Sequence, residues 1–243
     1  KMVRSDKACA GVMFTLDTES GHPEMLYITG AYGLGENVVQ GTVDPDEFYV
    51  YKQTLKNGFA PLLKKRVGTK QQKMVYAKAG LTTENVATTT IEREYFVLTN
   101  NEILELARAG LIIEEHYSAR KGAWCPMDIE WAKDGRDELL YIVQARPETV
   151  HSLKKQNTHL EEFFLTTKPE QATVLVAGKS VGRKAVSGIA RVMNSATNLA
   201  SINDQTIIIT DMTDPDWEPI MKIARGIVTN RGGRTCHASI ISR

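Results

Sequence analysis

Short apolar runs separated by polar turns occupy the first part of the chain. Residues 11–15, 25–29 and 48–51 are rich in apolar and β-branched side chains, and Gly, Pro and Asp bound them. Runs of this length between turn-forming residues are typical of β-strands. The pattern therefore predicts a strand at each of the three ranges.

A different period appears in residues 100–117, where apolar positions recur every three or four residues. That spacing places them on one face of a helix. The positions concerned are Ile103, Leu104, Ala107, Leu111 and Ile112. Either Thr99 or Asn100 can cap the start of this helix, because both side chains can accept a hydrogen bond from its free backbone N–H groups.

A β-hairpin is predicted after this helix. Its strands are MDIEWA at 127–132 and LLYIVQAR at 139–146, and the turn-forming residues 133–137 join them. Successive side chains of a strand point to opposite faces of the sheet. The first strand therefore has one apolar face and one face with two carboxylates.

The carboxylates of this hairpin are those of Asp128 and Glu130. The apolar face of the same strand holds Met127, Ile129 and Trp131. If the register lets even-numbered positions of the two strands face each other, Gln144 and Arg146 join the two carboxylates. A paired acidic face can also be an ordinary solvated face, and both interpretations stand at this point.

From residue 147 to about 177 the pattern loosens into polar and charged residues, which predicts a partly helical linker between two domains. Strands are predicted at 206–210 and 226–229. Between them, TDPDWEPIMKIARG predicts a helix capped by Thr213 or Asp214, with proline in its first turn and glycine at its exit.

Composition limits the class of protein. The chain has 243 residues, 42% of them hydrophobic, so it can bury a core, and its net charge of +1 gives no global reason to bind nucleic acid or an anionic membrane. The three cysteines are too few and too far apart for a disulfide framework, which favours the reducing cytoplasm. No membrane span or signal peptide is evident. Both ends look cut, so we expect a fragment.

The end of the chain, RGGRTCHASIISR, predicts an anion site. A strand, a Gly-Gly loop and a helix bring free backbone N–H groups and the positive end of the helix dipole to one place. The cations from residue 219 onward have no Asp or Glu among them. They are Lys222, Arg225, Arg231, Arg234 and Arg243. This local field suits phosphate.

His237 follows the Gly-Gly loop in this stretch. With a reference pKa of about 6.5, its imidazole is largely neutral and nucleophilic near neutral pH, so it can accept a phosphoryl group and pass it on. From position alone, a polar residue in the first turn of an ordinary helix is an equally good interpretation.

The stretch GGRTCHASIISR resembles the phosphohistidine signature of the phosphoenolpyruvate-utilising enzymes. Three further motifs resemble the same family in the same order: VRSDKACAGVMFTLDTESG, YGLGENVVQGTVDPDEFYV, and MDIEWA with YIVQARPETV. Arg234 and Cys236 make the signature similar to that of the phosphoenolpyruvate synthases, whereas pyruvate, phosphate dikinases usually have Met and Ser there.

The resemblance implies an α/β (α+β) fold in three parts. Residues 1–146 would be the C-terminal part of an ATP-grasp nucleotide-binding domain, 147–177 a linker, and 178–243 an incomplete swivelling phosphohistidine β/α domain. It also implies that His237 is phosphorylated from ATP and then phosphorylates pyruvate. Thr235 matches a threonine that a regulatory kinase and phosphorylase modifies in related enzymes, although it can equally be a simple helix cap.

For the hairpin, the resemblance implies that Asp128, Glu130 and Gln144 hold Mg²⁺ and nucleotide and that Arg146 contacts phosphate. Such hard oxygen ligands suit Mg²⁺. The glycines of YGLGE can let the backbone approach a ligand, with Glu36 as a nucleotide contact, but a turn between strands explains them as well. Cys236 beside His237 lacks the second ligand pair that a metal site needs.

The implied activity is conversion of ATP, pyruvate and water into AMP, phosphoenolpyruvate and phosphate, a gluconeogenic step. ATP, pyruvate and Mg²⁺ are the expected ligands, a regulatory kinase and phosphorylase is the expected protein partner, and a homo-oligomer is left open. The alternatives are pyruvate, phosphate dikinase or another dikinase-type phosphotransferase, and, from a different class, a non-catalytic phosphocarrier module.

Overall fold

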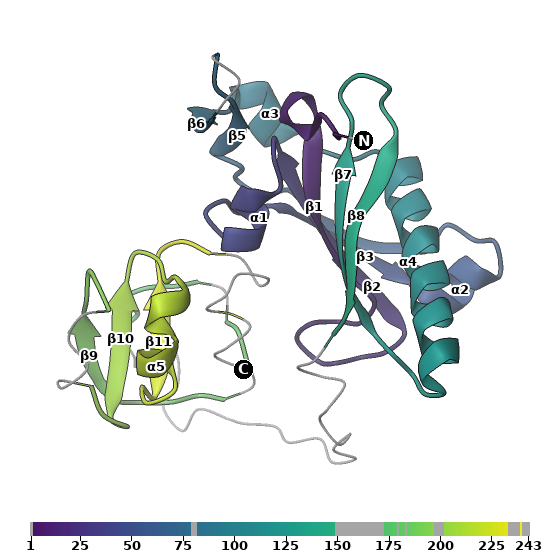
Figure 1. Cartoon of the computed structure of the whole chain (residues 1–243). Helices are drawn as coiled ribbons and strands as arrows, with labels where there is room; N and C mark the ends of the chain where they lie inside the picture. Colours follow the sequence, from purple (N-terminus) through teal and green to yellow (C-terminus); the bar gives the residue numbers. More distant parts are fainter. Residues whose placement is uncertain are drawn as a thin grey trace.

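The computed structural model describes residues 2–78, 82–148, 173–178, 180–182, 184–196 and 202–232, together with Ser239, and shows a mixed α/β chain (Figure 1). The elements before residue 149 are η1 Ser5–Lys7, β1 Cys9–Phe14, β2 Met25–Tyr32, α1 Glu36–Gln40, β3 Asp46–Tyr51, α2 Lys52–Lys56, β4 Leu62–Arg66, β5 Gln72–Tyr76, β6 Thr83–Ala87, α3 Thr90–Glu94, α4 Asn100–Lys121, β7 Met127–Lys133 and β8 Leu140–Pro147. Those after it are β9 Ile189–Val192, β10 Thr206–Thr210, η4 Pro215–Trp217, α5 Glu218–Met221 and β11 Gly226–Thr229.

Six of the strands form one antiparallel sheet in the order β4-β3-β2-β1-β7-β8. The three strands predicted at 11–15, 25–29 and 48–51 are confirmed as β1, β2 and β3, which form consecutive neighbours. Strand β1 pairs with β7 as well as with β2. The predicted hairpin is therefore joined to the sheet through a strand that lies more than a hundred residues earlier in the sequence.

Helix α4 covers one face of this sheet (Figure 1). The apolar face predicted for the hairpin packs into the same core, since Met127, Ile129 and Trp131 are almost completely buried together with Ile103 and Leu106 of α4. The structure extends the predicted helix by one turn, to Lys121, where Gly122 ends it with a left-handed φ of 69°.

The start of α4 is fixed by Thr99, not Asn100. The Thr99 hydroxyl accepts a hydrogen bond from the Glu102 backbone N–H, and the Glu102 carboxylate in turn accepts one from the Thr99 N–H at 2.7 Å. This capping box satisfies two N–H groups that would otherwise lack partners. Glu102 also forms an ion pair with Lys133 at the end of β7, which ties the helix to the hairpin.

We expect Thr99→Ala to lower the free energy of unfolding by about 1 kcal/mol, because the helix loses its cap. Urea unfolding followed by tryptophan fluorescence measures this loss, because Trp131 is buried in the core that α4 covers. Thr90→Ala, at an exposed position in the first turn of α3, is the matched control and should change stability by less than about 0.5 kcal/mol. Equal effects of the two substitutions would contradict the capping role.

The opposite face of the sheet carries a smaller apolar cluster. It consists of Val12, Phe14, Tyr27, Ala31, Val38 and Val43, with Tyr49 packed against them. Val38 belongs to α1, which contacts β1 and β2 and so lies on this second face. The carboxylates predicted to face away from the α4 core are on the same side.

A buried ion pair holds a loop to the start of β3. Lys70 and Asp46 are both fully buried, and Lys70 Nζ lies 2.5 Å from Asp46 Oδ1. The Asp46 carboxylate also accepts hydrogen bonds from the backbone N–H groups of Gly68 and Val97, both at 2.8 Å. One carboxylate thus joins three segments that are distant in sequence.

The second sheet is parallel, with the order β11-β10-β9. The strands predicted at 206–210 and 226–229 are confirmed as β10 and β11. Trp217, Ile220 and Met221 from η4 and α5 pack with Ile208 of β10 in its core. The carboxyl ends of β10 and β11 lie at the same edge, and the glycine pair predicted to form a loop, of which only Gly232 is among the described residues, follows β11 in the sequence.

The single helix predicted between these strands is wrong in its extent. The structure has a short 3₁₀ turn, η4, followed by the four-residue α5, and Gly226 begins β11 instead of ending a helix. Pro219 has no N–H to continue the hydrogen-bond ladder across the junction, which explains the break. Asp214 is the residue that acts at the start, since its Oδ1 accepts from the Asp216 N–H at 2.9 Å.

Most of the predicted linker lies outside the described residues, and its helical content therefore stays a prediction. Strand β8 runs through Pro147, and Glu148 is buried with its N–H donating to Pro126 O at 2.7 Å. Residues 173–178 have no regular secondary structure and are exposed. Among the helices that the structure describes, none has the length and apolarity needed to cross a bilayer.

Candidate functional site

The β7–β8 hairpin has the register on which the predicted site depends. Asp128 lies opposite Arg146, and Glu130 lies opposite Gln144. The sequence condition that even-numbered positions face each other is therefore met. A register shift follows directly after Glu130, so that Trp131 pairs with Ile142. Such irregularities bend a strand and change the direction of its side chains.

The same register continues across the whole sheet in two rows of side chains on one face. The first row is Arg146, Asp128, Phe14, Tyr27, Tyr49 and Lys64. The second row is Gln144, Glu130, Val12, Thr29, Glu47 and Arg66. Each row is polar at both ends. The middle of the first row is aromatic, with the ring centroids of Tyr27 and Tyr49 4.8 Å apart, and the middle of the second row consists of Val12 and Thr29.

The two polar ends of the second row differ in one respect. At the β4 end, Arg66 pairs with Glu47 at 2.7 Å and with Asp44 at 2.8 Å, so these charges satisfy one another. At the β8 end, neither the half-buried Glu130 carboxylate nor the exposed Gln144 amide has a hydrogen-bond or ion-pair partner within the described ranges. Two oxygen-bearing groups are left open side by side.

Asp128 and Arg146, by contrast, are joined. Arg146 Nη2 and Nε both donate to Asp128 Oδ2, at 2.8 and 2.9 Å. The Arg146 side chain is 63% exposed and that of Asp128 only 14%. Burial raises the pKa of the Asp128 carboxyl above its usual range, although the hydrogen bond from Arg146 acts in the opposite direction. The sequence motifs assign separate roles to Asp128 and Arg146 and do not predict this ion pair. The predicted register nevertheless places the two residues opposite each other.

Glu36 is exposed at the first position of α1, where it accepts a hydrogen bond from the Gln40 side chain at 2.8 Å. Because α1 packs on the second face of the sheet, the structure brings Glu36 to the side that carries the hairpin carboxylates. The close approach permitted by the first glycine of YGLGE is made to the protein itself. Gly33 has a φ of 88°, and an added Cβ would lie 2.4 Å from Met74 O of β5.

The donor set of the hairpin fits a magnesium ion in its chemistry. Mg²⁺ prefers one or two carboxylates together with waters and phosphate oxygens over a closed cage of protein ligands. Glu130 and Gln144 supply one carboxylate and one amide oxygen from neighbouring strands. No group of three or more His, Cys, Asp or Glu side chains with metal-binding geometry occurs among the described residues, so an ion here would need ligand oxygens as well.

The cation excess predicted near the chain end is partly neutralised by acids from earlier in the sequence. Lys222 pairs with Glu218 at 2.7 Å, and Arg231 lies 3.3 Å from Asp211 at the carboxyl end of β10. Arg225 donates to Gln205 Oε1 at 2.8 Å. The remaining cations of this set, Arg234 and Arg243, lie outside the described residues, as do Thr235, Cys236 and His237.

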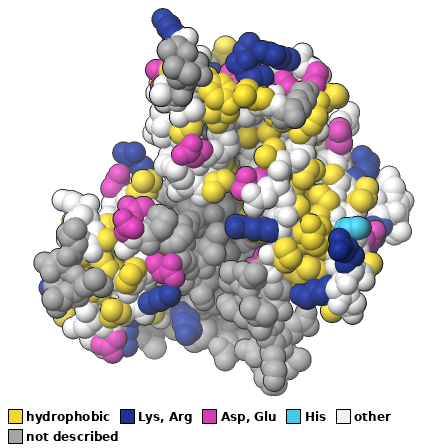
Figure 2. Space-filling view, in the orientation of Figure 1, with side chains coloured by type: hydrophobic (Ala, Val, Ile, Leu, Met, Phe, Trp, Pro, Cys, Tyr) yellow, Lys and Arg dark blue, Asp and Glu magenta, His cyan; other side chains and the backbone are white. Residues whose placement is uncertain are grey.

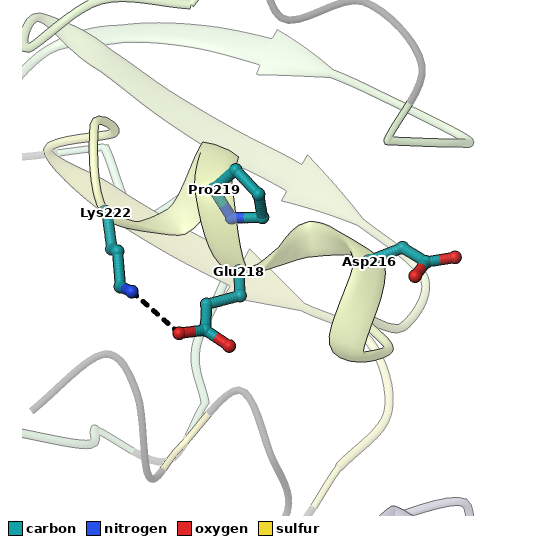
Figure 3. Close-up of a pocket in the computed structure, with 4 residues that line it drawn as sticks. All are labelled: Asp216, Glu218, Pro219 and Lys222. Carbon is teal, nitrogen blue, oxygen red and sulfur yellow. Dashed lines mark ion pairs between the residues drawn. The ribbon is translucent and has the colours of Figure 1, made fainter.

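A surface depression of about 520 Å³ lies beside α5, lined by Asp216, Glu218, Pro219 and Lys222 (Figure 3). The Lys222–Glu218 ion pair lies within it, and both of these side chains are largely exposed.

Figure 2 shows a second surface feature, hydrophobic side chains gathered over the region of α4 and β8. The exposed apolar residues of this region include Ile112, Leu139 and Val143. Neither feature contains a residue of the predicted site.

Comparison with known proteins places this hairpin in a family. Residues 1–166 match the family model described as pyruvate phosphate dikinase, AMP/ATP-binding domain. The chain belongs to this dikinase family. Residues 202–243 match a second model, described as PEP-utilising enzyme, mobile domain. The first match covers the six-stranded sheet with the hairpin, and the second covers β10, β11 and the sequence positions of the glycine pair and His237.

Several curated relatives of this dikinase family match along the whole chain. A phosphoenolpyruvate synthase of Synechocystis is 52% identical, one of Neisseria meningitidis 50%, and one of Escherichia coli 46%. In each case the match covers all of this chain but only 29–30% of the relative. The chain thus spans less than a third of the length of these synthases.

Proposed function

We propose that this chain forms part of a phosphoenolpyruvate synthase that converts ATP, pyruvate and water into AMP, phosphoenolpyruvate and phosphate. The observation that carries the proposal is the open pair of Glu130 and Gln144 beside the exposed guanidinium of Arg146. This is a set of groups suited to metal and phosphate, and it lies within the residues that match the AMP/ATP-binding model. The relatives named as synthases cover the same residues.

In the proposed enzyme, residues 1–146 are the C-terminal part of an ATP-grasp domain, and the hairpin binds the nucleotide. Glu130 and Gln144 hold Mg²⁺, Arg146 contacts a phosphate, and Glu36 contacts the nucleotide from α1. Bound Mg²⁺ would neutralise charge that develops on the transferring phosphoryl group. The protein's own groups orient the phosphates on the sheet face and keep them next to the metal ligands.

The phosphohistidine domain, residues 178–243, is proposed to carry the phosphoryl group on His237. The linker, residues 147–177, supplies the freedom for it to move between the ATP site and a distant pyruvate site. The exposed residues 173–178, which have no regular secondary structure, are consistent with a flexible connection. Thr235 is proposed as the target of a regulatory kinase and phosphorylase, because a phosphate there would oppose the negative charge of phosphohistidine.

A substrate panel on the full-length protein tests the proposed activity. With ATP, Mg²⁺ and pyruvate, and with inorganic phosphate removed enzymatically, we expect phosphoenolpyruvate and AMP to form in equal amounts. If phosphoenolpyruvate formation depends on added phosphate, the protein is a pyruvate, phosphate dikinase and not a synthase. A protein that makes no phosphoenolpyruvate but accepts a phosphoryl group from another phosphoprotein would instead be a non-catalytic carrier.

A further inference from the structure

The guanidinium group of Arg146 has one edge occupied and one edge open. Nε and Nη2 both point at a single oxygen of Asp128, which is a side-on arrangement that uses one edge of the planar group. The N–H groups on Nη1, and the second one on Nη2, have no partner within the described ranges. This open edge has the geometry that pairs with two phosphate oxygens.

The exposures of the two side chains agree with this division. The Asp128 side chain is 14% exposed, set against the sheet in the row that contains buried Phe14, whereas the Arg146 side chain is 63% exposed. The mostly buried Asp128 carboxylate therefore holds the guanidinium group next to the sheet, and the open edge of Arg146 is accessible to a ligand.

Asp128 also differs from the two groups that suit a metal ion. Glu130 and Gln144 have no partner among the described residues, whereas the negative charge of Asp128 is already shared with Arg146, which occupies Oδ2 with two N–H groups and leaves only Oδ1 open. Along β7, Asp128 lies two residues from Glu130, a distance of roughly 7 Å. We propose that Asp128 is a positioning residue that orients Arg146 toward the nucleotide phosphates, and that it is not a magnesium ligand. This inference rests on the proposed function, which supplies the nucleotide.

The physical basis is preorganisation. Arginine has a long side chain, and a ligand that must order it on binding loses affinity. A carboxylate that already fixes the guanidinium removes that cost, as in other binding sites whose polar groups are held in place beforehand. Electrostatics acts in the opposite direction, because the negative charge of Asp128 near a phosphate is by itself unfavourable. The sign of the effect of a substitution therefore separates the two roles.

The experiment measures by calorimetry the Kd of the full-length protein for α,β-methylene-ATP, an ATP analogue that cannot donate its β-phosphoryl group to His237, once in EDTA and once with saturating Mg²⁺. For Asp128→Asn we expect the Kd to rise between about two- and tenfold, the size expected for ordering one long side chain. The rise should be the same in both conditions, since Arg146 acts without the metal. Glu130→Gln is the matched control, and it should weaken binding only when Mg²⁺ is present.

Two results would overturn the positioning role. If Asp128→Asn weakens ATP binding only in the presence of Mg²⁺, Asp128 is a metal ligand. If the substitution tightens binding, Asp128 acts only as a repelling charge. A general loss of structure is excluded by requiring the thermal unfolding midpoint of the variant to match the wild type within about 2 °C.

A double-mutant cycle with Arg146→Gln makes the dependence on Arg146 explicit. If Asp128 acts through Arg146, Asp128→Asn should no longer raise the Kd in the Arg146→Gln background, where the substitution removes only an unfavourable negative charge. Independent effects of the two substitutions would overturn the inference while leaving the proposed function intact. A wild-type protein that binds no ATP in either condition would remove the proposed function itself, so the two failures are distinguishable.

Discussion

Replacing His237 by alanine is expected to abolish the acid-labile, base-stable labelling of the full-length protein by β-labelled ATP. The proposed enzyme transfers a phosphoryl group to the imidazole, and alanine offers no atom that can accept it. Removal of a nucleophile from a catalytic group typically lowers the rate by more than about 10³-fold. Label on the protein is quantified after rapid gel filtration in the presence of Mg²⁺.

His116→Ala is the matched control for this experiment, because His116 is an exposed histidine on α4 whose ring contacts only Tyr117 among aromatic neighbours in the described part of the chain. It should be labelled as fully as the wild type. The Kd of His237→Ala for ATP should also be unchanged, since the nucleotide groups are on the hairpin. Equal labelling of His237→Ala and the wild type would exclude His237 as the phosphoryl carrier.

Removing Lys70 is expected to destabilise the six-stranded sheet by about 3–5 kcal/mol in the variant Lys70→Met. The substitution leaves the Asp46 carboxylate fully buried without its cation, which is the costly way to break a buried ion pair. Burial already raises the pKa of Asp46 even with Lys70 present. Urea unfolding monitored by tryptophan fluorescence, to which buried Trp131 contributes, gives the change in free energy of unfolding.

Lys56→Met is the control for the loss of a lysine. Lys56 pairs with Glu115 at 2.7 Å, but both side chains are more than half exposed, so this pair should contribute less than about 1 kcal/mol. The double variant Lys70→Met with Asp46→Asn should recover part of the loss, since no buried charge remains. The prediction would be contradicted if Lys70→Met lowered the free energy of unfolding by less than about 1 kcal/mol. Asp46 would then have found another partner or taken up a proton at little cost in stability.

Much of the candidate site followed from local patterns. Alternation in MDIEWA placed Asp128 and Glu130 away from the core, and the short turn after it allowed a register in which Gln144 and Arg146 face them, as they do in the structure. These inferences succeed because side-chain direction in a hairpin depends only on neighbouring residues and on one register. The Asp128–Arg146 pair follows from the same register, but its side-on geometry does not.

Other features of the site could not be derived locally. The cations after residue 219 looked uncompensated in sequence. Glu218, which pairs with Lys222 four residues later, lies just before the stretch that was counted, whereas Asp211 pairs with Arg231 between the ends of neighbouring strands. Pairing across strands brings together residues that are distant along the chain. Counting the charges in one stretch of sequence does not reveal such ion pairs. The contrast between the closed Glu47–Arg66 pair and the open Glu130–Gln144 pair is likewise visible only across the complete sheet.

The sequence by itself determined the strands around β1 to β3, the long helix, the two faces of the hairpin and the family motifs, because each depends on short-range periodicity or on a contiguous signature. The tertiary structure alone decided that β1 lies between β2 and β7, that Asp46 and Lys70 meet in the interior, and that Pro219 divides the helix before β11. Those outcomes depend on which surfaces can be buried together, and burial is a property of the whole folded chain, not of any one segment.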